Sequence, residues 1–214
     1  MPETMLQKLP TGFSQNDFAL IRELRDVGVL RELRPEEFRA DTGTVPVLCS
    51  DGDRAWDVFN HHTAACMEAN FPIRPHVIAY PGAPILLSRH SPAVLGIHID
   101  RLLIYGIKTG PEMKQIKTVV IVPHWPCGMA KLCNLDFIRT LELSMNGKAR
   151  LKRELTHAVK EIVVCLHVDY GENKQGERIM RTYHIDQQKW LRWITTKKHG
   201  EQYPTDLYLA SMPL

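Results

Sequence analysis

The sequence lacks the features that mark secreted, membrane-spanning and disulfide-stabilised proteins. Residues 1–5 contain neither the basic start nor the apolar stretch of a secretory signal. The apolar runs are too short and too often interrupted to cross a bilayer. The five cysteines are an odd number at irregular spacing, which argues against a disulfide framework. We therefore expect a cytoplasmic protein in a reducing setting, where clustered cysteine and histidine more often indicate a metal or catalysis.

A strong charge of either sign is also absent, as are internal repeats and low-complexity tracts. The formal net charge is +3 over 214 residues, and Lys and Arg are spread along the chain. The densest basic cluster, at 150–153, falls on a predicted helix, where a solvated face is the simpler interpretation. We expect neither nucleic acid nor a membrane as a partner. A hydrophobic content of 44% and a charged content of 24% are ordinary for a globular protein with a sizeable core.

From residue 44 onward the apolar pattern alternates between short strands and helices. It predicts an α/β fold with a mainly parallel central sheet of about four strands, one antiparallel edge strand, and helices on both faces. Ser14 can cap a helix over 14–34, so we expect residues 1–44 to form an N-terminal helical arm and residues 45–214 a single α/β zinc-binding domain. The strands are predicted at 45–49, 76–80, 118–122 and 162–168, with the edge strand at 179–185. The helices are predicted at 53–71, 91–109, 128–143, 148–160 and 186–196.

Two short motifs follow two of these strands. Cys49 ends the first strand, and His124 and Cys127 follow the third. Because ligands of such sheets bind beyond the carboxyl ends of the strands, we expect two thiolates and an imidazole to meet at one sheet edge. These donors suit Zn²⁺, and three protein ligands leave a fourth position open, as in catalytic sites. We therefore predict Cys49, His124 and Cys127 as zinc ligands; the alternative for the cysteines is a core position.

Asp51 and Arg54 come directly after Cys49, and we predict that they act as a catalytic pair. The Arg54 guanidinium would hold the Asp51 carboxylate ionised and aimed at zinc-bound water. Alternatively, residues 51–52 form a simple turn, and we expect Asp53 to cap the following helix. Simpler roles are expected for the other candidates: core positions for Cys66, Cys133 and Cys165, a solvated helix face for His61 and His62, and no required contact with the site for His157, His167 and His184.

Together these residues resemble the two motifs of the β-class carbonic anhydrases, Cys-x-Asp-x-Arg and His-x-x-Cys-Gly. The matching positions are Cys49, Asp51, His124, Cys127 and Gly128, and the resemblance covers residues 45–185. It implies zinc held by the two cysteines and the histidine, with Asp51 and an Arg as a gating pair. It also implies the reversible hydration of carbon dioxide to bicarbonate, and a homodimer or a higher even oligomer. The chain departs from the family pattern at this pair, because residues 52–53 replace a single residue.

Other functions remain open beside this zinc lyase. One is a diverged relative that acts on another small electrophile, or that is catalytically silent with Asp51 as the fourth zinc ligand. Another makes Cys49 a nucleophile, since residues 49–54 also resemble the anion-binding Cys-x4-Arg loop of rhodanese-like sulfurtransferases. In that loop, Asp51 and Asp53 would repel an anionic substrate. An apolar tail at 207–210 can pack on a partner subunit or close the chain's own core.

Overall fold

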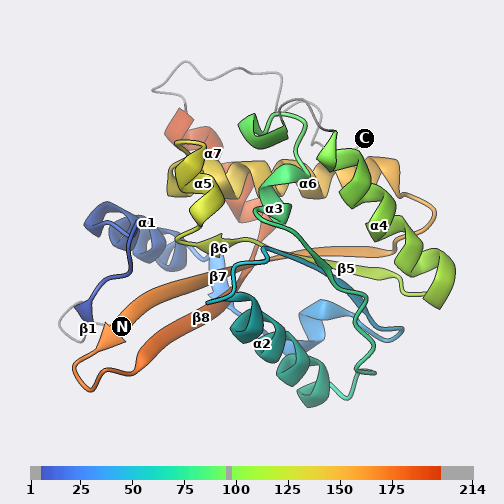
Figure 1. Ribbon diagram of the computed structural model, residues 1–214, viewed down its shortest axis with the longest axis horizontal. Coiled ribbons are helices and arrows are strands. Elements are labelled where there is room, and N and C mark those ends of the chain that lie inside the picture. The colour runs from blue at the N-terminus through green and yellow to red at the C-terminus, as the bar shows by residue number, and fades with distance from the viewer. Residues whose placement is uncertain (1–5, 95–97, 199–214) are drawn as a thin grey trace.

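The computed structural model describes residues 6–94 and 98–198, which form an α/β structure around one mixed sheet (Figure 1). The sheet has eight strands, six of which follow the order β2-β8-β7-β5-β3-β4. The other two, β1 and β6, each pair with β7 beside this path. Helices cover both faces of the sheet. The alternating sequence pattern therefore predicts the class of this fold correctly.

Four parallel strands form one half of the sheet, and their order creates the crevice that holds the site. They are β3 (Thr44–Leu48), β4 (Ile78–Ala79), β5 (Thr118–Val122) and β7 (Glu161–Asn173). Strand β3 lies between β4 and β5, so the chain leaves β3 in one direction and returns past it to form β5. Open α/β sheets bind ligands at such a switch point, beyond the carboxyl ends of the strands. Cys49 directly follows β3, and His124 lies two residues after β5.

The other half of the sheet is antiparallel, and it corrects one prediction. Strand β8 (Arg178–Ile185) pairs with β7 on one side and with β2 (Leu30–Glu32) on the other. The prediction of β8 as an edge strand is therefore wrong, because β2 covers its outer side. The two remaining strands are short: β1 (Leu6–Lys8) runs antiparallel to β7, and β6 (His124–Trp125) runs parallel to it.

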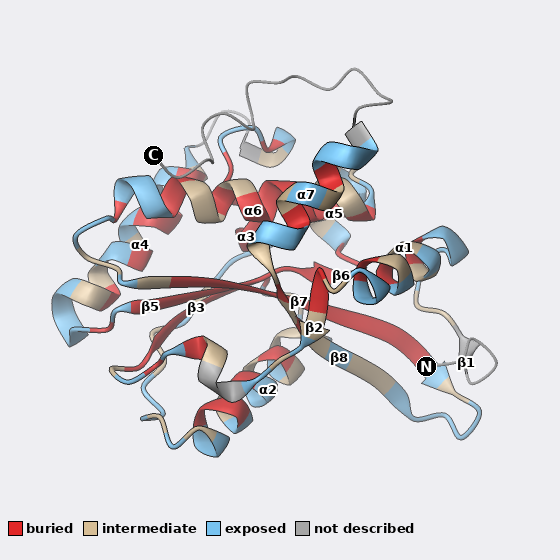
Figure 2. Cartoon of the chain, turned by 180° about the vertical axis from the view of Figure 1, so that it is seen from behind, coloured by how far each residue is buried: buried red, intermediate tan, exposed pale blue. Residues whose placement is uncertain are grey.

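The helices form one layer on each side of the sheet (Figures 1 and 2). The layer on one side includes η2 (Pro35–Phe38) and α2 (Ala55–Glu68). The opposite layer contains α1 (Gln15–Asp26), α3 (Ala83–Leu86), α4 (Ile99–Lys114), α5 (Gly128–Leu132), α6 (Phe137–Glu154) and α7 (Gln187–Lys198). A short 3₁₀ turn, η3 (Pro92–Val94), precedes α4. Within the described residues, no helix has both the length and the apolar character needed to cross a membrane.

The central strands are buried from both sides. In β5, Val119 and Ile121 lie in the larger core cluster, whereas Val120 and Val122 lie in a second cluster with residues of η2 and α2. Figure 2 shows β3, β5 and most of β7 as buried. Continuous burial of this kind explains why these strands have almost wholly apolar sequences rather than alternating ones.

The N-terminal segment contains the predicted helix, but that helix ends earlier than its sequence pattern indicates. Ser14 and Asp17 form a capping box at the start of α1, as expected for a Ser N-cap. The helix ends at Asp26, and Gly28 follows with a φ of 73°, a left-handed conformation that helices do not continue through. The chain then enters β2 instead of extending the helix to residue 34. The division into an arm (1–44) and a domain (45–214) stays a prediction, although Ile21 of α1 belongs to the larger core cluster.

Two predicted helices after β6 have different boundaries in the structure. The predicted helix over 128–143 is divided into α5 and the start of α6, because Asn134 adopts a φ of 53° and Asp136 caps a new helix. The predicted separate helix over 148–160 is wrong, because α6 continues through Gly147 and ends at Glu154. A Cβ atom at Gly147 would lie 2.7 Å from the Leu87 side chain, so close packing explains this glycine. The predicted helix over 91–109 corresponds to η3 and α4. Residues 95–97 and the apolar tail at 207–210 lie outside the described residues.

Protonation of His62 is expected to destabilise the protein as the pH falls. This side chain is buried, with its Nε2 atom 2.7 Å from Thr44 Oγ1 and its ring edge-on to Phe38. Burial lowers the pKa of His62 to about 4, from an ordinary value of 6.5. The unfolded chain therefore binds a proton at a higher pH than the folded chain does. The free energy of unfolding should fall by up to about 3 kcal/mol as the pH drops through this window.

Urea unfolding near neutral pH and near pH 4 measures this dependence. A His62→Gln variant removes the titrating group and should lose less stability between the two pH values than the wild type. A His90→Gln variant, at an exposed histidine, should behave as the wild type does. Equal pH dependence in the wild type and His62→Gln would contradict the assignment.

Candidate metal centre

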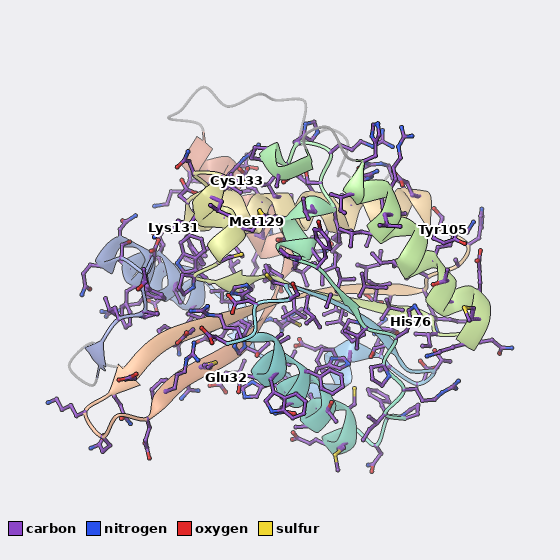
Figure 3. The ribbon with its side chains drawn as sticks, viewed as in Figure 1. Glu32, His76, Tyr105, Met129, Lys131 and Cys133 are labelled. Atoms are coloured by element: carbon purple, nitrogen blue, oxygen red, sulfur yellow. The ribbon has the colours of Figure 1, made fainter. Side chains whose placement is uncertain are left out.

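Cys49 is positioned by the end of β3 and by a close backbone approach from Gly82. The Cys49 Sγ atom accepts a hydrogen bond from the Gly82 N–H at 3.1 Å. Gly82 has a φ of 70°, and a Cβ atom there would lie 2.5 Å from Cγ of Met129, which is on α5 (Figure 3). Only glycine satisfies both conditions, and it allows the backbone to reach the sulfur.

His124 and Cys127 are held between β7 and α5. His124 and Trp125 pair with His167 and Val168 of β7, and the Trp125 ring also packs edge-on against Phe137. The bond between Trp125 and Pro126 is cis. Cys127 then occupies the N-cap of α5 in an extended conformation. The local chain therefore presents both side chains of the His-x-x-Cys motif from a well-packed segment.

The structure brings the three predicted ligands together. One ligand atom from each of Cys49, His124 and Cys127 lies within 4.8 Å of the others, in a geometry able to bind a metal ion. All three residues are buried. Both ring nitrogens of His124 are buried without a hydrogen-bond partner. Because buried polar atoms nearly always have partners, this histidine fits a metal ligand better than a core residue.

The two thiols interact strongly with each other. A hydrogen bond from Cys127 lowers the pKa of Cys49 to about 4, although burial opposes this shift, and His124 and the Gly82 N–H contribute in the same direction. The pKa of Cys127 is raised, because its proton is held by the Cys49 sulfur. The lowered pKa of Cys49 favours its thiolate, and a thiolate is the form that binds metal.

Asp51 and Arg54 form the predicted pair in spite of the extra residue between them. Asp51 Oδ2 lies 2.9 Å from Arg54 Nη1 and 4.0 Å from His124 Nε2. Asp51 Oδ1 accepts a hydrogen bond from the Asp53 N–H at 3.0 Å. The N–H groups of Arg54 and Ala55 donate to the Asp51 carbonyl, which closes a turn that returns Arg54 over Asp51. Both carboxylate oxygens of Asp51 therefore have partners.

Two further residues of this network, Asp169 and Arg178, were not predicted from the sequence. Asp169 Oδ2 lies 3.0 Å from Arg54 Nη2 and 2.7 Å from Arg178 Nη2, and Asp169 Oδ1 accepts the Gly171 N–H. Burial alone would raise the pKa of Asp169, but the bonds from Arg178 and Gly171 and the charge of Arg54 hold it below its ordinary value. The available signal was an Asp inside an apolar strand, but the predicted strand ends at 168, whereas β7 continues to Asn173.

The other sequence candidates divide into those near the centre and those away from it. Asp53 does not cap α2, since the N-cap is Arg54 and it makes no side-chain cap bond, so that prediction is wrong. His62 is buried rather than solvated, which is a second correction. Cys66 and Cys165 are buried as predicted, whereas Cys133 is half-buried at the end of α5 (Figure 3). Of the remaining histidines, His157 is exposed, His184 contacts Arg31, and His167 lies beside His124 on the neighbouring strand.

A cleft of about 860 Å³ opens beside the centre. Its walls come from residues 9–12, the 51–54 turn, residues 125–128 and the β7–β8 hairpin. Both Asp51 and Cys127 contribute to its lining, so the metal-binding group borders space that a small molecule can enter.

Comparison with protein-family models and with curated proteins found no match for this chain.

Proposed function

We propose that this protein is a zinc-dependent lyase of the β-class carbonic anhydrase kind, which reversibly hydrates carbon dioxide to bicarbonate as a cytoplasmic homodimer or higher even oligomer. One observation carries the proposal: two cysteines and a histidine converge beside an Asp–Arg pair at the carboxyl ends of β3 and β5. Sulfur and imidazole donors favour zinc over magnesium or calcium. Three protein donors with a carboxylate nearby are typical of a catalytic zinc site rather than a structural one.

The chemistry at this centre needs a nucleophile and an acceptor that orients it. Cys49, His124 and Cys127 would hold zinc, which when bound would lower the pKa of water from ~15.7 to about 7 and so provide a hydroxide nucleophile. Asp51 Oδ2 is the acceptor, since it lies 4.0 Å from His124 Nε2 and faces the group of donors. Arg54 keeps this carboxylate ionised, and Asp169 holds Arg54 in place. Hydration adds the hydroxyl group of one water molecule to carbon dioxide, which gives bicarbonate, and the other proton of that water leaves to solvent through the cleft.

The contacts of Asp51 favour an open fourth position over a closed one. A closed site would require Asp51 to give one oxygen to the metal. Here Oδ2 is bound by Arg54 and Oδ1 by the Asp53 N–H. Asp51 would have to leave Arg54 before it could act as a ligand, so the silent interpretation needs a rearrangement that the catalytic one does not.

The size of the cleft supports a second candidate, a zinc enzyme that acts on a larger electrophile. A volume of about 860 Å³ falls in the range of sites for drug-sized ligands and is far larger than carbon dioxide requires. The sulfurtransferase interpretation has less support. It needs the Cys49 sulfur to be activated by the first turn of α2, whereas the backbone donor to that sulfur is Gly82.

An Asp51→Asn variant tests the proposal in a carbon dioxide hydration assay. Asparagine keeps the size of the side chain but removes the charge that orients the nucleophile. We expect the rate constant kcat to fall by about 10²–10⁴-fold, the usual contribution of such a group. Zinc content should stay unchanged, because Asp51 is not one of the three ligands.

An Asp53→Asn variant is the matched control, since it makes the same change in the same turn. Asp53 contacts this network through its backbone, since its N–H donates to Asp51 and its carbonyl accepts from Arg178, so hydration should match the wild type. Full hydration by Asp51→Asn would contradict the role of Asp51. A zinc-loaded wild-type protein without hydration activity would exclude the lyase and favour the second candidate.

A further inference from the structure

We propose that Asp57, His61 and His167 form a second site for a divalent transition metal, on the α2 side of the sheet. One ligand atom from each of them lies within 4.8 Å of the others. Asp57 and His61 lie one turn apart on α2, and His167 comes from the centre of β7. Figure 1 shows α2 packed beneath the sheet beside β8, so the three side chains come from two elements that face each other.

The Thr182 side chain on β8 orients both imidazoles toward Asp57. Its Oγ1 atom lies 3.2 Å from His61 Nδ1 and 3.0 Å from His167 Nδ1. A hydroxyl oxygen has two acceptor positions, so it can accept a hydrogen bond from each Nδ1–H. Each ring then presents the lone pair of Nε2 on its opposite side. Metal-binding histidines are commonly held in this way by an outer hydrogen-bond acceptor.

The Nε2 atoms converge on a carboxylate oxygen that has no hydrogen bond of its own. Asp57 Oδ2 lies 3.3 Å from His167 Nε2 and 3.8 Å from His61 Nε2. This oxygen is buried and lacks a hydrogen-bond partner. The lone pairs of the two Nε2 atoms and the negative Asp57 oxygen therefore face one another with no proton or cation between them, and they repel. A metal ion bound by all three atoms removes this repulsion and satisfies the buried oxygen.

The donors indicate the class of ion. Two imidazoles and one carboxylate suit zinc, iron or copper better than magnesium or calcium, which prefer oxygen ligands. The Met180 Sδ atom lies 3.4 Å from His167 Nε2 and adds a soft atom at the site. The His61 side chain is 43% exposed, which gives an ion a path to the otherwise buried His167.

The second site is independent of the proposed reaction but adjacent to its centre. His167 is the register partner of His124 on β6, and neighbouring strands lie about 4.8 Å apart. Helix α2 also begins directly after the 51–54 turn that carries the Asp–Arg pair. A metal bound by Asp57, His61 and His167 would fasten this helix to β7, and it would stabilise the folded protein because the unfolded chain has no preformed site.

A cobalt titration of metal-free protein distinguishes the two sites. Co²⁺ bound by Cys49 and Cys127 gives thiolate-to-metal charge-transfer absorption, whereas Co²⁺ bound by histidine and carboxylate does not. We expect the wild type to bind about two equivalents, only one of them with charge-transfer absorption. His61→Gln should lose the second equivalent and keep the charge-transfer absorption. This variant should fold, because His61 is on the surface.

Two further variants sharpen the test. Thr182→Val keeps the shape of the side chain but removes the outer acceptor, so the affinity of the second equivalent should fall by about 10–100-fold. His157→Gln makes the same change as His61→Gln at another exposed histidine and should bind as the wild type does. The inference is wrong if the wild type binds only the equivalent with charge-transfer absorption, or if His61→Gln binds as much cobalt as the wild type. If the wild type lacks the charge-transfer band but still binds the equivalent that depends on His61, the result contradicts the cysteine site and leaves the second site intact.

Discussion

Replacement of Cys49 by serine is expected to remove one equivalent of zinc per chain and to abolish carbon dioxide hydration. A serine hydroxyl is a weak zinc ligand, and the remaining His124 and Cys127 cannot hold the ion by themselves. The substitution also removes the sulfur whose lowered pKa favours the thiolate form. In the cobalt-substituted protein, the charge-transfer absorption should weaken sharply. Metal analysis of purified protein, combined with the hydration assay, measures both effects.

A Cys133→Ser variant provides the matched control for this substitution. Cys133 lies only six residues from Cys127, at the end of α5, but it does not belong to the group of donors (Figure 3). It should retain the metal and the activity of the wild type. If Cys49→Ser keeps its full metal content, the assignment of this cysteine as a ligand is wrong.

Replacement of Asp169 by asparagine is expected to cost about 3–5 kcal/mol of unfolding free energy, the usual effect of removing one partner from a buried ion pair. The Asp169 side chain is only 1% exposed, and it lies against the guanidinium groups of Arg54 and Arg178. Arg54 is itself 12% exposed, and of its two ion-pair partners among the described residues Asp51 alone would remain. Denaturant unfolding at neutral pH measures the loss.

The pH dependence of Asp169→Asn provides an independent check. The pKa of Asp169 is held below its ordinary value of 3.8, so this carboxylate stabilises the folded protein above that pH. The contribution is lost as the pH falls through the lower, folded-state value. The variant should therefore approach the wild type in stability under strongly acidic conditions. Glu172→Gln, at an exposed position on the same strand, should change stability by less than about 0.5 kcal/mol. If Asp169→Asn also changes the unfolding free energy by less than about 0.5 kcal/mol, the Arg54 charge is adequately solvated without Asp169.

The strand ends show how far local sequence patterns predict this protein. The runs before Cys49 and His124 are short, β-branched and apolar, so they indicate buried strands with donors at their carboxyl ends. The structure has β3 and β5 at those positions, within one residue of the predicted boundaries. The contact between Asp51 and Arg54 was also predictable, because only two residues lie between them and a single turn is enough to bring their side chains together.

Prediction failed where contacts depend on strands that are distant in the sequence. Strand β2 has three residues and becomes a strand only because β8 lies beside it. Asp169 reaches Arg54 because β7 runs past the end of β3, and no local pattern near either residue indicates this contact. His61 is exposed, as predicted, but its contacts with His167 and Thr182 were not predictable, because these residues lie more than 100 positions away in the sequence.

The sequence alone determined the chemical nature of the donors, the alternation of strands and helices, and the location of Cys49 and His124 at strand ends. Residue type and apolar periodicity are local properties, so they can be read without knowledge of the fold. The tertiary structure decided that β3 and β5 are neighbours, that Gly82 approaches the Cys49 sulfur, and that α2 brings Asp57 and His61 to β7. These contacts follow from strand order and register, which depend on how all the buried surfaces pack together.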